Sequence, residues 1–287
     1  METQYFQYKG INFASMLYSE ERLHFLENDF QVRDDDVFNV TFPKSGTHWM
    51  VEILSLIRSN GDPSWCQKVP NWERIPWLEI SGYAGQFADH QTSPRYFSSH
   101  LPIQFFPKSF FTSKAKIIYT ARNPKDVLVS LYNFALMSTV IKTPHSFDEL
   151  IEDFLNGTVP FGSWFDHIKG WMQMKDRNNF LFITFEELKK DHRGTVMKIC
   201  KFLGKELDEE ALDLVVEHSS FKMMKDNSMS NHSQAPEFFI DKNSNFLRKG
   251  ISGDWRKCLT EAQKENVDKL YKEKMEGFNM KFVWDEL

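Results

Sequence analysis

Three short apolar runs along the chain are typical of strands that are buried on both faces. They cover residues 37–42 (VFNVTF), 116–121 (KIIYTA) and 180–183 (FLFI). Runs of this length that are bounded by turn residues favour strands over helices. Helical spacing follows the first two runs, with apolar residues three and four apart between Trp49 and Ile57 and a helix expected from about Lys125. Strand and helix therefore alternate from the first run onward.

Boundary signals divide the second half of the chain into further helices. Ser146 with Glu149, and Thr184 with Glu187, have the spacing of capping boxes. Glycines that are expected to end helices stand at positions 157 and 204. Further helices are expected at 193–203, 208–218 and 260–276. This order predicts an α/β fold, with a central parallel β-sheet flanked by helices and one domain over residues 1–287.

Two stretches lack regular spacing. Residues 59–98 are rich in Pro, Gly and Trp, and residues 222–254 also resemble loop. Because a long segment without periodicity more often covers a site than builds a core, we expect the first stretch to cover a functional site.

Composition and charge narrow the class of protein. The chain has 27 Phe and 8 Trp, more rings than a core alone needs, and its formal net charge is −5. No overall field favours nucleic acid or an anionic membrane, and no apolar run approaches the ~20 residues of a membrane span. Cys66, Cys200 and Cys258 form no CxxC pair, and the N-terminus has no signal-peptide pattern. We therefore expect a cytoplasmic protein.

The turn after the first strand has the chemistry of an anion site. In Pro43-Lys44-Ser45-Gly46-Thr47, glycine allows close approach of the backbone, lysine adds a charge, and the hydroxyls can donate. The following helix N-terminus offers free N–H groups and the positive end of a dipole. The lysine precedes Ser-Gly, and no glycine stands five residues before it, so the turn is not a Walker A loop.

Two more basic clusters fit the same ligand. Arg122 stands where the second strand ends, and Ser130 lies two turns into the next helix. Arg248 and Lys249 precede Gly250 in a loop. Each cluster alone is compatible with a solvated surface. Three of them in an acidic chain indicate one polyanionic ligand.

Three motifs occur in order along the chain: FPKSGT after the first strand, RNPKDV after the second, and RKGISGDW near the C-terminus. In this order and spacing they resemble the cytosolic sulfotransferases, most closely the hydroxysteroid and bile-salt subfamily. The likeness runs from Phe6 to beyond Trp255. It implies transfer of a sulfuryl group from 3′-phosphoadenosine 5′-phosphosulfate (PAPS) to a hydroxyl of a small hydrophobic acceptor, a bile acid or a steroid.

The resemblance also assigns the PAPS site. It implies that the phosphosulfate is bound by Lys44, Ser45, Gly46, Thr47, His48 and Trp49. It implies that the 3′-phosphate is bound by Arg122, Ser130, Arg248, Lys249 and Gly250. The adenine falls to Trp49, Phe185, Ser219, Phe221 and Met224. No metal is expected, because the chain has neither HExxH nor Cys/His ligand spacing.

His100, in FSSHLP, matches the catalytic histidine of the family. An alcohol needs a base to take its proton as the new S–O bond forms, and imidazole has a suitable pKa. Lys44 is expected to stabilise the charge that develops on the leaving bisphosphate.

The chain departs from the family pattern at several positions. His48 replaces a usual Asn, as a hydrogen-bond donor to the phosphosulfate or as a second base. The anion is expected to raise the pKa of its imidazole and so to favour the donor role. Phe185 keeps the ring of a usual Tyr and loses its hydroxyl.

The acceptor site is expected to be aromatic. The resemblance assigns Trp72, Trp77, Phe134, Ala135, His232 and Phe239 to it. Ala135 replaces a Trp, which predicts a wider pocket that suits bent bile acids.

The C-terminal dimer motif is degraded to Arg256, Thr260, Glu261 and Glu265, which predicts a weak homodimer or a monomer.

Two other functions stay open on these observations. A small phosphoryl-transfer enzyme would share the anion turn but lacks the Walker A lysine placement. A non-catalytic binder would keep a sterol or bile acid in a degenerate pocket. The retention of Lys44, His100, Arg122, Ser130 and Arg248 favours an active sulfotransferase.

Overall fold

The computed structural model of the protein describes residues 5–82, 88–236, 239–241 and 245–285. The strands are β1 (Tyr5–Tyr8), β2 (Ile11–Ala14), β3 (Val37–Thr41), β4 (Tyr96–Ser99), β5 (Lys116–Ala121) and β6 (Phe180–Thr184). The helices are α1 (Glu20–Asn28), α2 (Thr47–Arg58), α3 (Ser64–Lys68), α4 (Asn71–Arg74), α6 (Pro124–Met137), α7 (Phe147–Asn156), α8 (Trp164–Met172), α9 (Phe185–Lys190), α10 (His192–Leu203), α11 (Glu209–His218), α12 (Phe221–Asp226), α13 (Trp255–Cys258) and α14 (Glu261–Met275). Two 3₁₀ turns lie at Ile103–Phe105 and Lys108–Thr112.

A four-stranded parallel sheet organises the chain, in the order β4-β3-β5-β6. The register places Val40 of β3 beside Ser99 of β4 and Tyr119 of β5. Because all four strands are parallel, their carboxyl ends meet at one edge of the sheet. The expected α/β architecture with a central parallel sheet and flanking helices is confirmed.

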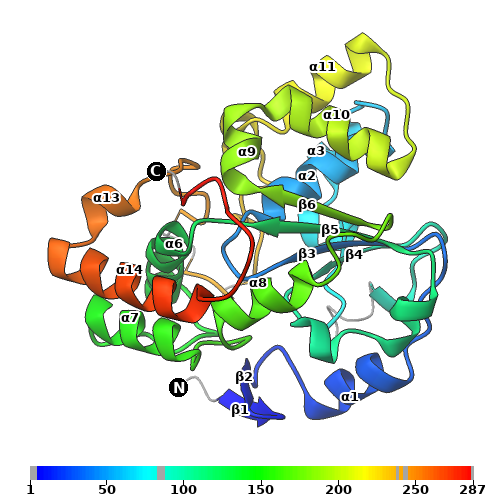
Figure 1. Cartoon of the computed structure of the whole chain (residues 1–287). Coiled ribbons are helices and arrows are strands. Elements are labelled where there is room, and N and C mark those ends of the chain that lie inside the picture. Colours follow the sequence, from blue (N-terminus) through cyan, green and yellow to red (C-terminus); the bar gives the residue numbers. More distant parts are fainter. Residues whose placement is uncertain (1–4, 83–87, 237–238, 242–244, 286–287) are drawn as a thin grey trace.

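Side-chain alternation along the strands builds two cores. Phe38, Val40 and Tyr119 point into one apolar cluster, whereas Val37 and Ile118 point into the other. The first cluster includes side chains of α1, α6, α7 and α8, and the second includes those of α2, α10 and α11. Figure 1 shows α10 and α11 on one side of the sheet and α1 and α8 on the other. Burial on both faces explains the continuous apolar runs in the sequence.

The expected boundary signals are largely confirmed. Thr184 and Glu187 form a complete capping box at α9, and Gly157 and Gly204 end α7 and α10 in the left-handed conformation. At α7 the box is incomplete: Ser146 Oγ accepts from the Glu149 backbone N–H, but the Glu149 carboxylate accepts from Lys142 and His145 instead.

The segment of residues 59–98 contains more regular structure than expected. It holds α3, α4 and the edge strand β4, which is only four residues long and half serine (YFSS). The antiparallel β1–β2 hairpin was also not predicted, because its residues do not alternate in burial. The described residues between 222 and 254 are mostly loop as expected, apart from α12.

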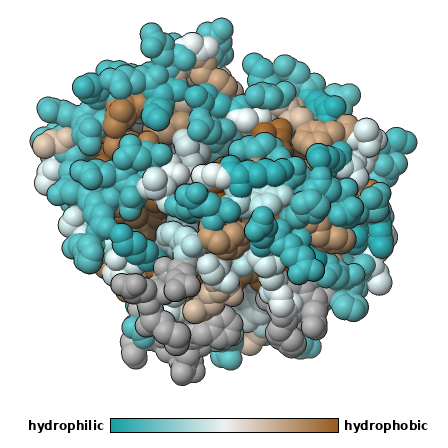
Figure 2. All heavy atoms as spheres, turned by 90° about the horizontal axis from the view of Figure 1, so that it is seen from below, coloured by the Kyte–Doolittle hydropathy of each residue, from teal (hydrophilic) through white to brown (hydrophobic). Residues whose placement is uncertain are grey.

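The surface carries no single large apolar area on the face shown in Figure 2, where hydrophobic residues form separate patches among hydrophilic ones. Large exposed apolar side chains of the described residues, such as Leu136 and Met197, come from separate elements. Scattered residues of this kind are normal on soluble surfaces. No helix of the described chain is long and apolar enough to cross a membrane.

Candidate active site

The carboxyl edge of the sheet opens into a cavity of about 660 Å³. Each strand delivers a side chain to its wall with the residue or residues that follow it: Lys44 after β3, His100 after β4, Arg122 after β5 and Phe185 after β6. Ligands of α/β proteins bind at this edge because the loops there converge. The topology thus brings together residues that lie far apart in the sequence.

The anion turn contains two residues with positive φ. Gly46 is the N-cap of α2 with φ 107°, and Lys44 has φ 69°. A Cβ at Gly46 would lie 3.0 Å from the Phe185 ring, so the turn packs directly against that ring. Ser45 Oγ is buried and has no hydrogen-bond partner among the described residues. The free amides at the start of α2 can bind anionic oxygens. An anion in this turn would also give the Ser45 hydroxyl a partner.

Lys44 extends into the cavity between two aromatic rings. Its Nζ lies 4.2 Å from the ring centroid of Phe134 and 4.5 Å from that of Phe246. Burial, followed by the nearby charges of Arg122 and Arg248, lowers the pKa of the ammonium group to about 7. A bound anion would restore the charged form.

Arg122 connects the anion turn to residues 248–255, which we call the basic segment. Its guanidinium donates to the Lys44 carbonyl at 3.1 Å and to the Ile251 carbonyl at 3.0 Å, and it stacks over Phe185 at 4.2 Å. Its Nε–H is buried without a partner among the described residues. A buried donor without a partner is costly, so a ligand oxygen that accepts from this N–H would gain binding energy.

The basic segment is held by two buried carboxylates. Asp254 accepts from Arg248 at 2.6 Å and from Lys249 at 2.8 Å. Asp126 of α6 accepts from the backbone N–H groups of residues 253 and 255 at 2.7 and 3.2 Å. Gly250 has φ 62°, and a Cβ there would lie 2.1 Å from the Phe221 ring. The two cations are thus fixed at the cavity wall before any ligand arrives.

The residues assigned to the adenine converge on the same side. Trp49 Nε1 donates to the Ser219 carbonyl at 2.8 Å, and its ring meets Phe185 edge to face at 5.3 Å. Phe221 and Met224 line the cavity with them. The Ser219 side chain instead donates to the Val215 carbonyl at 2.6 Å. Neither Ser45 nor Ser219 belongs to the described cavity wall, so their direct contact with a ligand stays a prediction.

His100 is held at three points. Its Nδ1 lies 2.7 Å from the Thr41 carbonyl oxygen, its backbone N–H donates to the Glu79 carboxylate at 2.7 Å, and its carbonyl accepts from His167 at 3.0 Å. Because a carbonyl only accepts, Nδ1 carries the proton and Nε2 keeps its lone pair. Burial lowers the pKa of this imidazole to about 3. The ring is therefore neutral, and its Nε2 is unprotonated.

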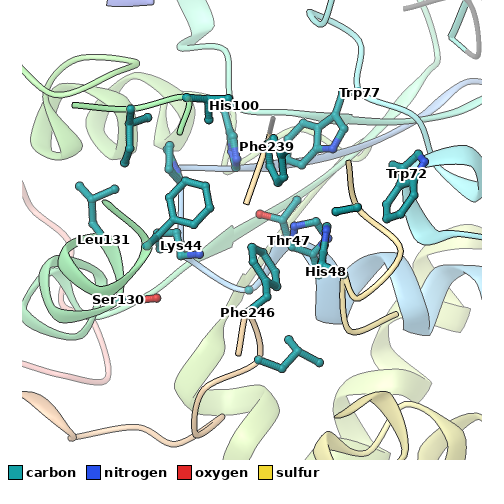
Figure 3. A pocket seen from close by; sticks show the side chains of 18 of the residues that line it. Lys44, Thr47, His48, Trp72, Trp77, His100, Ser130, Leu131, Phe239 and Phe246 are labelled. Atoms are coloured by element: carbon teal, nitrogen blue, oxygen red, sulfur yellow. The ribbon is translucent and has the colours of Figure 1, made fainter. Parts of the chain in front are cut away.

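Aromatic side chains form the wall beyond His100. Trp77 lies 4.5 Å from the His100 ring centroid, and Trp72, Phe134, His232 and Phe239 also line the cavity. Figure 3 shows Lys44, His48 and His100 around one hollow with Trp77 beside both histidines. These expected acceptor-side residues are brought together.

Ala135 is an exception that corrects the sequence interpretation. Its side chain is fully buried in the first apolar cluster, and it is not among the residues that line the cavity. Helical geometry turns it away from the wall on which its neighbour Phe134 lies. The argument that alanine widens the pocket for bent bile acids therefore fails.

His48 lies beside a second histidine rather than alone. Its Nδ1 is 3.2 Å from His232 Nε2, and the ring centroids are 4.3 Å apart. Burial, followed by the charges of His232 and Lys44, holds the pKa of the His48 imidazole well below its usual range. These causes all come from the chain itself. The increase expected from a bound phosphosulfate stays a prediction.

Several functional residues were not identified in the sequence. Phe246 packs against Lys44 and His48, Thr41 fixes the His100 ring, and Asp126 holds the basic segment. Asp254 was within reach of sequence reasoning, since it follows the two cations by a few residues. The others act across distances that no local pattern encodes.

The match to a sulfotransferase domain covers residues 34–279. The chain belongs to the sulfotransferase family. It is 53% identical to mouse Sulfotransferase 2B1, over 98% of this chain and 83% of that protein. It is 48% identical to the guinea pig (Cavia porcellus) 3-beta-hydroxysteroid sulfotransferase, over 97% of both chains. The expected family and enzyme class are confirmed.

The fold of this sulfotransferase is also that of a solved relative. The structure of mouse sulfotransferase SULT7A1 complexed with PAP matches with a TM-score of 0.80 and 32% identity, and the match covers 95% of this chain and 94% of that one. Among the described residues, no group of three or more His, Cys, Asp or Glu side chains is placed to hold a metal ion.

Proposed function

We propose that this sulfotransferase uses PAPS to sulfate a hydroxyl group of a hydroxysteroid, with Lys44 and His100 at the reacting atoms. One observation carries the proposal: a single cavity joins a basic, anion-binding end to an aromatic end, and these two side chains lie where the ends meet. The relative named as a 3-beta-hydroxysteroid sulfotransferase and the relative complexed with PAP support the two substrates.

The basic end fits the nucleotide part of PAPS. The amides of α2 and the cations Lys44, Arg122, Arg248 and Lys249 surround it. Arg122 Nε, at this end, and Ser45 Oγ, buried in the adjoining anion turn, have no hydrogen-bond partner among the described residues. Phosphate oxygens would satisfy both donors, and the rings of Trp49 and Phe185 offer faces and edges to a base. We assign Ser130, which lines the same end, to the 3′-phosphate with Arg122.

The geometry supports a division of work between two side chains. His100 Nε2 accepts the hydroxyl proton as the acceptor oxygen bonds to sulfur, a transfer favoured because the anionic phosphosulfate raises the pKa of the imidazole above its ligand-free value of about 3. The bond between sulfur and the 5′-phosphate oxygen breaks, and its electron pair leaves with the bisphosphate. Lys44, charged once the anion is bound, stabilises that oxygen. Positioned donors of this kind act on charge that develops only in the transition state.

The aromatic end suits a flat, rigid hydrocarbon. Trp72, Trp77 and Phe239 offer large apolar faces, and Leu131, Val140 and Ile141 add aliphatic surface at the wall. Fused rings bury apolar area here without losing conformational entropy. With Ala135 outside the wall, the preference for bent bile acids loses its structural ground, and a 3-hydroxysteroid is the proposed acceptor.

The place of action belongs to the proposal as well. All three cysteines are free, and two of them, Cys66 and Cys200, are buried. Unpaired buried thiols suit a reducing compartment, and we infer that the enzyme works in the cytoplasm.

A labelled-transfer assay tests the proposal. The enzyme is supplied with ³⁵S-labelled PAPS and separately with a 3β-hydroxysteroid, its 3-keto analogue, a bile acid and a simple phenol. We expect label on the hydroxysteroid, none on the ketone, and a lower kcat/KM for the bile acid and the phenol. Failure to label any hydroxyl compound contradicts sulfuryl transfer, and a phenol preferred over the steroid contradicts the acceptor class.

A further inference from the structure

Two histidines from distant parts of the chain share one hydrogen bond at the cavity wall. His48 is the second residue of α2, and His232 lies 184 residues later in the loop after α12. Their nitrogens, Nδ1 of His48 and Nε2 of His232, are 3.2 Å apart. One proton must lie between these two atoms, because two lone pairs facing each other would repel.

Asn71 completes the arrangement and leaves only one proton to place. Its side-chain N–H₂ donates to the Ser230 carbonyl at 3.2 Å, which fixes the orientation of the amide. The same nitrogen lies 3.4 Å from His48 Nδ1 and 3.5 Å from His232 Nε2. Its second hydrogen therefore goes to whichever imidazole nitrogen carries the lone pair.

Two pairs of tautomers satisfy this geometry. They differ in which of the two remaining nitrogens, His48 Nε2 or His232 Nδ1, carries a proton. In the first, His232 Nε2–H donates to His48 Nδ1, which leaves His48 with Nε2–H and His232 with a lone pair on Nδ1. In the second, both rings are reversed. His232 Nδ1 is buried and has no partner among the described residues. The second arrangement therefore buries an unpaired N–H, whereas the first buries an unpaired lone pair.

The first arrangement is the less costly one. Buried N–H groups without partners are rarer in proteins than under-satisfied acceptors, and each costs the desolvation of a donor. The neutral Nε2–H form is thus selected at His48. His48 lines the cavity, and its Nε2 makes no hydrogen bond to a described residue. The selected N–H therefore faces the ligand space.

We propose that His48 is a further catalytic residue, whose Nε2–H donates a hydrogen bond to an oxygen of the transferring sulfuryl group, and that His232 is the positioning residue that sets this tautomer. The inference rests on the proposed sulfuryl transfer. His48 follows the anion turn directly, so its ring stands beside the place where the phosphosulfate would bind.

His100 and His48 then have opposite tautomers and opposite tasks. Thr41 accepts from Nδ1 of His100, so that His100 presents a lone pair and acts as the base. His232 donates to Nδ1 of His48, so that His48 presents a proton and acts as a donor. Figure 3 shows the two rings on different sides of the hollow, near Trp77. The structure thereby decides between the two roles that the sequence left open for His48.

The tautomers can be measured without any substrate. Protein labelled with ¹⁵N-histidine is examined at pH 7 by two-bond ¹⁵N–¹H correlation, with ring signals assigned through His48→Asn and His232→Phe. We expect a protonated Nε2 and a bare Nδ1 at His48, and the reverse at His100. A His48 ring protonated at Nδ1 alone, or at both nitrogens, overturns the proposal.

Kinetics of two His48 variants test the donor role. His48→Asn keeps an N–H donor, whereas His48→Leu removes it at similar bulk. We expect kcat within about threefold of wild type for the first and a loss of ~100-fold for the second, as for removal of one oxyanion donor. PAP lacks the sulfuryl group, and the proposed contact forms only to that group. The dissociation constant of PAP should therefore change by less than about threefold in both variants.

Two kinetic outcomes contradict the inference. If both variants lose activity equally while PAP binding is intact, the imidazole acts as a base that an amide cannot replace. If His48→Leu is as active as wild type, the ring has no role in transfer. The failure of the proposed function is a separate result: wild-type enzyme would then label no hydroxysteroid, while the NMR measurement still reports the tautomer.

Discussion

Lys44 shows how a single residue of this site depends on its ligand. The ammonium group is packed between Phe134 and Phe246, and no described residue forms a salt bridge with it. Its surroundings lower its pKa to about 7, first through burial and then through Arg122 and Arg248. A buried cation without an anion is costly, so the charged form of Lys44 is disfavoured until an anion binds. The phosphates of the nucleotide would supply that anion.

This residue should take up a proton when the nucleotide binds. At pH 8 most of free Lys44 is neutral, because its pKa is about 7, and a bound anion raises that pKa again. At pH 6 the group is already charged. Calorimetric titration with PAP in buffers of different ionisation enthalpy should therefore show uptake of up to one proton at pH 8 and little at pH 6.

Lys44→Met is the control for that measurement. At pH 8 the phosphates of PAP are fully ionised, so an uptake that disappears in the variant belongs to the lysine. Equal uptake in both proteins, or none in wild type at pH 8, would refute the assignment.

At the scale of elements, the segment from Arg248 to Trp255 is a loop that behaves as a fixed part of the site. Asp126 of α6 holds its backbone from outside, Asp254 pairs with Arg248 within it, and Gly250 packs against the Phe221 ring. The affinity for the nucleotide should therefore depend on the path of this backbone and not only on its two cations.

Gly250→Ala tests the role of that path. A Cβ would lie 2.1 Å from Phe221 at a positive φ of 62°, so the loop must shift, and we expect the affinity for PAP to fall by at least tenfold. Gly277→Ala is the matched control: it has a similar φ of 76° but nothing within 4 Å of the added Cβ. Calorimetry that gives the same affinity for both variants would show that the contact with Phe221 does not shape the site.

The elements also show what the sequence can and cannot predict. Three strands and the helices after them were found because buried strands give continuous apolar runs and helix ends carry local signals. The edge strand β4 was missed, since Tyr96–Ser99 is short and half polar, yet it carries His100 to the cavity. The burial of Ala135 away from the cavity and the pairing of His48 with His232 could not be predicted. Both depend on packing between distant segments, and no local pattern contains that information.

At the scale of the whole molecule, assembly stays a prediction. Glu261 begins α14 with a side chain that is 82% exposed and paired with Lys264, within the segment that we interpret from the sequence as a degraded dimer motif. A desolvated carboxylate would weaken a small apolar contact. Sedimentation at sub-micromolar concentration should show a monomer or a rapidly dissociating dimer. A tight dimer that Glu261→Val does not strengthen would contradict this account.

The parallel sheet explains why one molecule can hold both substrates. Its carboxyl edge places the anion turn after β3, the proposed base His100 after β4 and Arg122 after β5 around one cavity, which aromatic residues also line. Proximity of this kind converts a reaction between two molecules into one within a complex, where orientation supplies much of the rate.

The most direct test of this account is a single-turnover measurement with ³⁵S-labelled PAPS and a 3β-hydroxysteroid, in wild type and in His100→Ala. We expect wild type to transfer the label. The variant should bind PAP with unchanged affinity and lose at least ~100-fold in rate, the usual range for removal of a general base. A wild-type enzyme that holds PAPS and the steroid without transferring label, or a variant that transfers it at the wild-type rate, would contradict the central claim that this cavity is a sulfuryl-transfer site with His100 as its base.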